Sequence, residues 1–302
     1  MTNDLANNLP DVKGNLSRGS LTVLSRIIDA LLNFPFAKKS IIWGWYQCLS
    51  ALDKEADMTC MNYGYAPLDF LEPEIEWRDE DQANRYCLQL YQQVAGGVNL
   101  QDKELLEVGC GRGGGAFFIG KYLKPRSMTG IDFSSNAVAF CKSHYKLEGL
   151  SFLHGDAENL PCPSNSFDAV INIESSHCYN SMERFLREVV RVLRPQGSFL
   201  FADLCLREEV PSLRARLRRS GLNILEEERI TPNVLRALEL DNERKLSLIQ
   251  SKVPKFLRER VQQFAGVVGS PVYQRFHSGE WEYLRFVLQK GGPDGSVIFE
   301  EE

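Results

Sequence analysis

The chain has 302 residues, of which 43% are hydrophobic and 25% are charged, and its formal net charge is −5. This length can bury a large core, and this composition is typical of a globular protein in water. The acidic balance argues against a surface built to bind nucleic acid, so we expect no nucleic-acid partner.

The cysteines and the apolar runs predict the compartment. None of the eight cysteines belongs to a C-x-x-C pair, which argues against a zinc knuckle or a redox pair, so we expect no metal site. The first twenty residues are polar and predict no signal peptide, and the apolar runs at 21–34 and 41–52 are too short to span a membrane. Because scattered thiols fit a reducing environment, we expect a cytoplasmic protein.

The N-terminal segment is rich in apolar and aromatic residues. Within 18–52, Trp43 and Trp45 follow two lysines. The pattern predicts two amphipathic helices, which dock on the body of the protein, exchange with a neighbouring subunit or lie on a membrane surface. We expect a helical arm over 1–78 and a homo-oligomer, with peripheral membrane contact through this arm as an alternative.

An aromatic turn at 62–67 precedes the first long helix. It carries Tyr63 and Tyr65, and it covers a cofactor, walls a substrate pocket or packs two tyrosines into the core. Apolar residues at helical spacing then predict a helix over 79–94, which Gly96 and Gly97 end.

A short apolar strand runs into a glycine-rich turn at 103–115. Gly109, Gly111 and Gly114 satisfy the G-x-G-x-x-G pattern, so a nicotinamide or flavin dinucleotide is one candidate ligand. Glu107 argues against it, because its carboxylate would repel a pyrophosphate and attract the ammonium group of an amino acid. The E-x-G-x-G arrangement resembles the first motif of class I S-adenosylmethionine-dependent methyltransferases, and we assign Glu107, Gly109 and Gly111 to the cofactor site.

The second strand, predicted over 127–133, ends in an acidic residue. Asp132 lies about 20 residues beyond Gly111, where one carboxylate can accept hydrogen bonds from both ribose hydroxyls of a nucleotide. This signal applies to a dinucleotide as well as to S-adenosylmethionine. Ser134 is a good N-cap for a helix over 136–146.

A third strand over 150–154 leads into a polar loop. The loop sequence G-D-A-E-N-L-P, at 155–161, resembles the loop that holds the adenine in these methyltransferases. The resemblance implies that the Asp156 carboxylate accepts a hydrogen bond from the adenine amino group. We place four further residues in the same cofactor site: Phe133, Ala157, Glu158 and Ile173.

The remaining elements complete one sheet. The strand predicted over 167–173 is near-continuously apolar, as expected of a strand covered on both faces. We expect an α/β protein with a seven-stranded Rossmann-like methyltransferase sheet, helices on both faces, the last strand antiparallel, and ligands at the carboxyl ends of the strands. The further elements are a helix over 182–193, a turn at 194–197, a strand over 198–203, a helix over 208–219, a strand over 222–228, a helical insertion over 232–264 and a last strand over 282–289. The predicted divisions are a methyltransferase core over 79–230 and 266–290, a helical lid over 231–265 and a disordered tail over 291–302.

Five segments in order identify the region from about 80 to 290 as similar to class I methyltransferases. The runs G-D-A-E-N-L-P, E-x-S-H-C-Y, R-E-V-V-R-V-L-R-P and F-x-G-V-V-G-S resemble the phthiotriolone/phenolphthiotriolone dimycocerosate methyltransferase and fatty-acid O-methyltransferase group. The resemblance implies S-adenosylmethionine as donor, S-adenosylhomocysteine as product and a lipophilic hydroxyl or carboxyl compound as acceptor. Related bacterial enzymes methylate a prenyl carbon.

The segment after the fourth strand carries the candidate catalytic residues. His177 is the candidate base, although a hydrogen-bonded structural histidine is an alternative. Glu174 could orient that imidazole, contact the cofactor or stabilise a developing cation on an alkene acceptor. We expect Tyr63, Tyr65 and Tyr179 to line an apolar acceptor pocket together with the insertion.

Four functions stay open. The first is O-methylation of a lipophilic small molecule such as a lipid, a polyketide or a fatty acid. The second is C-methylation of a prenyl or polyketide carbon, in which Glu174 should matter more than His177. The others are a non-catalytic S-adenosylmethionine-binding assembly protein and a dehydrogenase.

Overall fold

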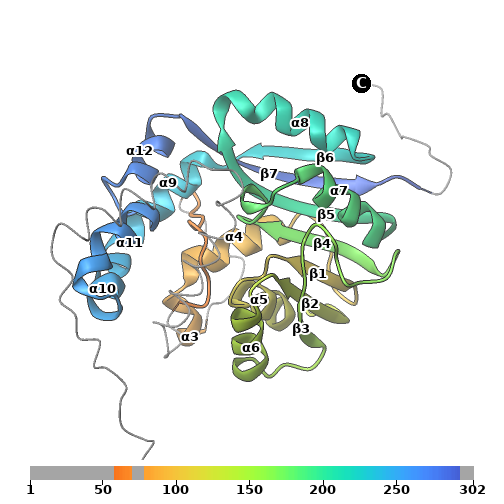
Figure 1. Cartoon of the computed structure of the whole chain (residues 1–302), viewed down its shortest axis with the longest axis horizontal. Coiled ribbons are helices and arrows are strands. Elements are labelled where there is room, and N and C mark those ends of the chain that lie inside the picture. The colour runs from red at the N-terminus through yellow and green to blue at the C-terminus, as the bar shows by residue number, and fades with distance from the viewer. Residues whose placement is uncertain (1–57, 70–77, 293–302) are drawn as a thin grey trace, which may run out of the picture.

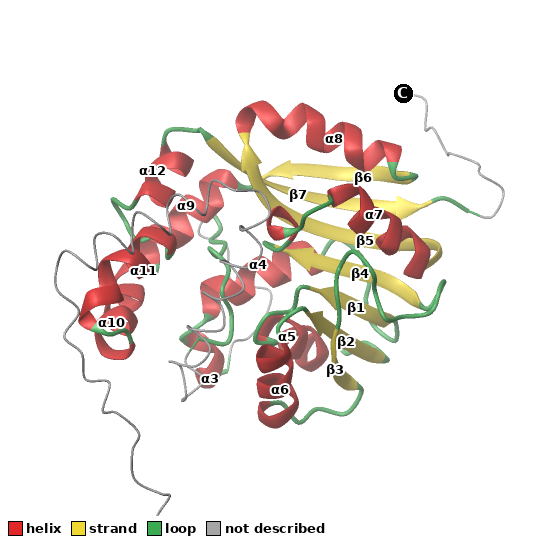
Figure 2. Ribbon diagram, in the orientation of Figure 1, coloured by secondary structure: helices red, strands yellow, loops and turns green. Residues whose placement is uncertain are grey.

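One seven-stranded sheet forms the centre of the molecule (Figures 1 and 2). The computed structural model describes residues 58–69 and 78–292. The strand order is β3-β2-β1-β4-β5-β7-β6, and β7 lies antiparallel between β5 and β6, whereas β1 to β5 pair in parallel. The strands are β1 (Glu104–Val108), β2 (Ser127–Asp132), β3 (Leu150–His154), β4 (Phe167–Ile173), β5 (Leu193–Leu206), β6 (Leu222–Arg229) and β7 (Trp281–Lys290).

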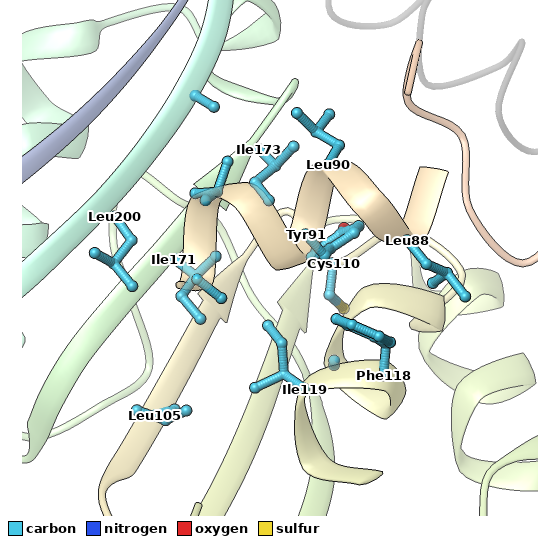
Figure 3. Close-up of a cluster of buried hydrophobic side chains, with 14 of the residues drawn as sticks. Leu88, Leu90, Tyr91, Leu105, Cys110, Phe118, Ile119, Ile171, Ile173 and Leu200 are labelled. Atoms are coloured by element: carbon cyan, nitrogen blue, oxygen red, sulfur yellow. The ribbon is translucent and has the colours of Figure 1, made fainter. Parts of the chain in front are cut away.

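Helices cover both faces of this sheet. On one face lie α4 (Arg85–Ala95) and α5 (Gly114–Tyr122), whose apolar side chains pack on β1, β4 and β5 (Figure 3). The other face is covered by α7 (Met182–Val192) and α8 (Val210–Arg219). Leu105 and Leu106 of β1 belong to the two different layers, because successive residues of a strand point to opposite faces.

The predicted sheet is confirmed, including its antiparallel last strand. Of the six strands whose bounds were predicted, five begin and end within one residue of the prediction. The exception is β5, where the predicted turn at 194–197 is wrong. β5 begins at Leu193, which pairs with Phe167, but the next pair is Ala169 with Ser198, so residues 194–197 bulge out of the ladder within the strand. Gln196, with a φ of 63°, absorbs this irregularity.

The helix predicted over 79–94 is divided. A short α3 (Asp79–Gln82) is separated from α4 at Ala83 and Asn84. Asn84 lies outside helical geometry, with φ −108° and ψ 13°. The side chain of Asn84 instead donates to the Thr59 hydroxyl at 3.3 Å, a contact that helical periodicity does not predict.

Further helices fill the interval between β6 and β7. They are α9 (Thr231–Leu240), α10 (Asn242–Lys252), a 3-10 turn η3 (Lys255–Leu257), α11 (Arg258–Phe264) and α12 (Pro271–His277). In Figure 1 they lie beyond one end of the sheet, on the left of the view. A further helix, α6 (Ser135–His144), packs beside β3, and Ser134 caps it as predicted by accepting from the Ala137 N–H at 3.1 Å.

The predicted helices within 18–52 lie outside the described residues, as do residues 293–302 of the predicted tail. Across 58–69 and 78–292, none of the helices combines the length and the apolar character that crossing a bilayer requires.

Candidate active site

A pocket opens at the carboxyl ends of β1, β2 and β4, where α/β sheets of this kind bind their ligands. Its floor is the glycine loop after β1, and its sides come from the loops after β2, β3 and β4. A fourth contribution comes from residues 59–62, which we call the strap. The lining residues predicted from the sequence are Gly109, Gly111, Asp132, Phe133, Asp156, Ala157, Ile173, Glu174 and Tyr179.

Neighbouring side chains lie so close to the backbone of the glycine loop that they leave no room for a Cβ atom. Gly109 has a φ of 76°, and a Cβ there would lie 1.9 Å from the Ser175 hydroxyl, so no other residue fits without moving the loop after β4. The following glycine run also has a packing reason. A Cβ on Gly114 would lie 2.5 Å from the Cys60 sulfur, and one on Gly115 would lie 1.9 Å from the Tyr91 ring. The loop therefore keeps the strap and α4 in direct contact with the start of α5.

Glu107 is buried beside this loop. The Tyr91 hydroxyl donates to Glu107 Oε1 at 2.7 Å, whereas Oε2 has no hydrogen-bond partner among the described residues. Burial raises the pKa of Glu107 to about 7, although the Tyr91 hydrogen bond acts in the opposite direction. Glu107 is not itself among the lining residues, but Tyr91 is. The orphaned oxygen is suited to a cationic group bound near the loop.

Asp132, at the end of β2, is held by two backbone amides. The Gly111 N–H donates to Oδ2 and the Ser134 N–H donates to Oδ1, each at 2.8 Å. Burial raises the pKa of Asp132, and these two amides oppose that shift. Each carboxylate oxygen keeps acceptor capacity toward the pocket, so the side chain can accept two adjacent hydroxyl groups.

The loops after β2 and β3 supply the side of the pocket that was assigned to the adenine. Ala157 is buried and Phe133 is 45% exposed, and both line the pocket with Asp156. Asp156 Oδ1 accepts from the Glu158 N–H at 3.0 Å, which fixes the loop. The side chain of Glu158 is not among the lining residues and accepts from the Asn180 N–H at 2.8 Å.

The strap and the adjoining Tyr63 are held by hydrogen bonds to α5, to α4 and to the residue that follows β4. The Gly114 N–H donates to the Thr59 carbonyl at 3.2 Å, and Asn62 Nδ2 donates to the Cys87 carbonyl at 3.2 Å. The strongest link is made by Glu174, whose two carboxylate oxygens accept from the Tyr63 N–H at 2.9 and 3.1 Å. The strap therefore closes the pocket above the glycine loop.

Glu174 occupies an unusual position. Its φ is 47°, in the left-handed region that non-glycine residues seldom adopt, and its carboxylate lines the pocket. Burial raises its pKa to about 7, while the Tyr63 N–H acts to lower it. The hydroxyl of Tyr283 is buried close to this carboxylate. A carboxylate already bound to a backbone amide is better suited to holding a segment than to accepting a proton.

His177 lies one turn beyond Glu174, in a 3-10 turn (Ser176–Cys178), and it pairs with a buried carboxylate. His177 Nδ1 is 2.7 Å from Asp203 Oδ1, and the His177 N–H and the Ser176 hydroxyl donate to Asp203 Oδ2 at 3.0 and 2.6 Å. Burial lowers the pKa of His177, but the Asp203 carboxylate raises it further, so the net value is well above the usual one. His177 is not among the pocket-lining residues, and its side chain is 32% exposed.

The three tyrosines predicted for the acceptor pocket are separated. Tyr179 lines the pocket, and its hydroxyl lies 2.7 Å from the Ser175 hydroxyl and accepts from Asn172 Nδ2 at 3.0 Å. Tyr63 and Tyr65 are not among the lining residues. The Tyr63 ring packs edge-on against Phe276, and Tyr65 packs on the hydrophobic core.

Several site residues were missed in the sequence. Asp203 lies within β5, directly after Ala202, which pairs with Ile173 at the end of β4. An acidic residue at this position, level with the carboxyl end of β4, was a usable signal for a partner of His177. Arg112 is buried in the pocket wall with its guanidinium 3.7 Å above the Phe140 ring. The residues 59–61, Tyr91 and Cys178 also line the pocket, and nothing in their local pattern predicts it.

The sequence of this chain is similar to those of known methyltransferases. A family model described as a methyltransferase domain matches residues 106–201. A phthiotriol/phenolphthiotriol dimycocerosates methyltransferase of Mycobacterium tuberculosis is 37% identical over 246 residues, which cover 82% of this chain and 90% of the relative. A fatty-acid O-methyltransferase of Mycolicibacterium smegmatis is 35% identical over 239 residues, covering 78% and 85%.

A solved structure agrees in fold. The geranyl diphosphate C-methyltransferase from Streptomyces coelicolor, in complex with Mg²⁺, geranyl diphosphate and S-adenosylhomocysteine, superposes with a TM-score of 0.58. It is 14% identical, and the match covers 84% of this chain and 97% of that one.

Proposed function

This chain belongs to the S-adenosylmethionine-dependent methyltransferases, and we propose that it methylates a hydroxyl or carboxyl oxygen of a lipophilic small molecule. The relatives at 35–37% identity are named for methylation of a fatty acid and of phthiotriol dimycocerosates. The observation that carries the oxygen assignment is the pairing of His177 with the buried carboxylate of Asp203 beside the pocket.

Each part of the cofactor has its own set of proposed binding residues. Asp132 would accept the ribose hydroxyls, and Asp156, Ala157 and Phe133 would hold the adenine. The unpartnered Glu107 Oε2 supplies negative charge near the ammonium end of the methionine. S-adenosylmethionine supplies, when bound, an electrophilic methyl group on a sulfonium.

His177 is the proposed base. Asp203 orients the imidazole through Nδ1, and Nε2 would take the proton of an acceptor hydroxyl. The proton transfer requires the neutral imidazole, and the Asp203 carboxylate also stabilises the imidazolium that forms. A carboxylate acceptor carries no proton to remove, so for an acid substrate His177 would act by position and charge.

Alignment supplies the larger share of the rate enhancement. Orientation of the two reacting groups can contribute about 7–11 kcal/mol, whereas a positioned base contributes about 10²–10⁴-fold. Closure of the strap over the pocket is therefore as important to the proposal as His177.

C-methylation of a prenyl carbon is the alternative, and it would need Glu174 to face a developing cation. Both oxygens of that carboxylate accept from the Tyr63 N–H, which favours a positioning role. The predicted homo-oligomer stays a prediction, which sedimentation velocity of the full chain would measure.

The function is tested by product analysis. The protein is incubated with methyl-labelled S-adenosylmethionine and, separately, a long-chain fatty acid, a long-chain alcohol and a prenyl diphosphate. We expect a labelled methyl ester or ether by mass spectrometry. Label on a prenyl carbon, or no transfer to any oxygen acceptor including a host lipid extract, would overturn the proposal.

A further inference from the structure

A small helical lobe projects away from the sheet. It consists of α10, η3 and α11, at the left of Figure 1, and it is built around its own cluster of Ile249, Val253, Val261 and Val267. This cluster is separate from the two layers that cover the sheet. The lobe can therefore present its outer surface without contributing to the main core.

One face of the lobe combines aromatic and basic side chains. Arg260 and Phe264 are four residues apart on α11 and therefore neighbours on its surface, and Lys255 and Phe256 lie in η3, which leads directly into this helix. We call these four residues the η3–α11 face. Phe256 is 65% exposed and Phe264 is 47% exposed, whereas Val261 of α11 is buried in the cluster of the lobe.

The charge of this segment is opposite to that of the chain. Residues 252–264 hold four basic side chains and one acidic one, in a protein with a formal net charge of −5. The Arg258 guanidinium donates to the Val253 carbonyl at 2.9 Å and to the Gln250 carbonyl at 2.5 Å, so it closes the end of α10 and makes no ion pair with the described residues. Exposed phenylalanines bordered by lysine and arginine are the composition of a segment that lies in a membrane interface.

The face is joined to the active site through two contacts. The Tyr63 hydroxyl donates to the Phe264 carbonyl at 3.3 Å, and the N–H of the same Tyr63 donates to Glu174 in the pocket. Lys245 Nζ also donates to the next carbonyl, that of Ala265, at 3.2 Å. Tyr63 therefore links the end of α11 to a carboxylate of the pocket.

We propose that the η3–α11 face docks on a lipid bilayer that carries anionic headgroups. Phe256 and Phe264 enter the interfacial region, and Lys255 and Arg260 pair with the headgroups. The choice of a bilayer rests on the proposed function, because a lipophilic acceptor resides there, but docking itself requires neither the cofactor nor the acceptor.

The test measures binding of the full chain to vesicles by co-sedimentation. We expect binding to vesicles that contain phosphatidylglycerol, weaker binding to pure phosphatidylcholine, and release by salt. The double change Phe256→Ser and Phe264→Ser should lower the partition coefficient at least about tenfold, because it removes the two aromatic rings that the bilayer would bury. Lys255→Glu should lower it about fivefold.

A matched control distinguishes binding through this face from unspecific hydrophobic binding to the vesicles. Leu225, on the edge strand β6, is 56% exposed, so Leu225→Ser removes a comparable exposed apolar group and should leave vesicle binding unchanged. Thermal unfolding and calorimetric S-adenosylmethionine binding should be unaltered in all these variants, because the changed side chains are exposed and outside the pocket.

Two outcomes would overturn the proposal. If the double phenylalanine variant binds vesicles as well as the unchanged protein, another segment such as residues 18–52 makes the contact. If Leu225→Ser lowers binding equally, the attraction is unspecific. Neither outcome depends on turnover, and methyl transfer to a water-soluble short-chain acceptor tests the proposed function separately.

Discussion

The two sides of the pocket use carboxylates differently. On the β1 and β2 side, Glu107 and Asp132 keep acceptor capacity, since Glu107 Oε2 has no partner in the described chain and Asp132 is held only by two amides. On the β4 and β5 side, Glu174 is taken by Tyr63 and Asp203 by His177. Glu107 and Glu174 have pKa values raised to about 7 by the same cause, burial. The two carboxyl groups thus have similar pKa values but different roles. The β1 and β2 side keeps acceptor oxygens for a ligand, whereas the carboxylates on the β4 and β5 side hold other groups of the protein in place.

The largest effect is expected on the β4 and β5 side. His177→Ala should lower turnover at least tenfold, and about 10²–10⁴-fold if the whole contribution of a base is lost, with an unchanged dissociation constant for S-adenosylmethionine. Single-turnover kinetics and calorimetry measure the two quantities. Unchanged turnover on the true acceptor would rule out His177 as the base.

The pH profile provides the control for His177. Asp203 raises the pKa of His177 above its usual value, so turnover should rise with pH through a pKa higher than that of an ordinary histidine. Asp203→Asn removes the charge that raises the pKa, so the rising limb should move to lower pH while the maximum falls. If the rising limb of the pH profile stays at the same pH in Asp203→Asn, the titrating group is not His177.

On the other side, Asp132→Ala should weaken S-adenosylmethionine binding about 10–100-fold, because two hydrogen bonds to a charged acceptor are lost. Turnover at saturating cofactor should change much less. Calorimetry of Asp132→Asn, which keeps one acceptor oxygen, should give an intermediate dissociation constant. A large fall in turnover with intact binding would move Asp132 to the catalytic side of the comparison.

Glu174→Gln should have a smaller effect, about three- to tenfold on kcat/KM, because an amide oxygen accepts from the Tyr63 N–H more weakly than a carboxylate does. The variant also has a stability signature. The folded-state pKa is raised, so the folded protein keeps a proton that the unfolded chain releases, and its free energy of unfolding falls as pH rises from about 4.5 to about 7. Denaturant unfolding across this range should show a shallower decline in the variant.

The smallest effect is expected for Glu107→Gln, and it concerns pH dependence. A bound cation favours the ionised carboxylate, so the affinity of the unchanged protein for S-adenosylmethionine should rise with pH up to about 7 and then level off. The variant should lose most of this slope, at most about tenfold between pH 6 and pH 8. If the affinity of Glu174→Gln no longer depends on pH while that of Glu107→Gln still does, Glu174 and not Glu107 interacts with the cationic group of the cofactor.

The parts that were predictable depend on local patterns. Mainly apolar runs bounded by polar residues, such as 167–173, locate strands, and the spacing from Gly111 to Asp132 locates the ribose side. The position of the strap does not follow from pattern, because its main link joins Tyr63 to Glu174 across 111 residues. The turn predicted at 194–197 failed since proline and glycine at an irregularity within β5 have the same local composition as a turn.

The insertion of β7 between β5 and β6 has a consequence for synthesis. Both neighbouring strands are made before residue 281, so during translation they present unpaired edges until the last strand of the sheet leaves the ribosome. Such edges are the usual starting points of aggregation. The nascent chain would therefore depend most on chaperones late in its synthesis, after the nucleotide-binding half has already been made.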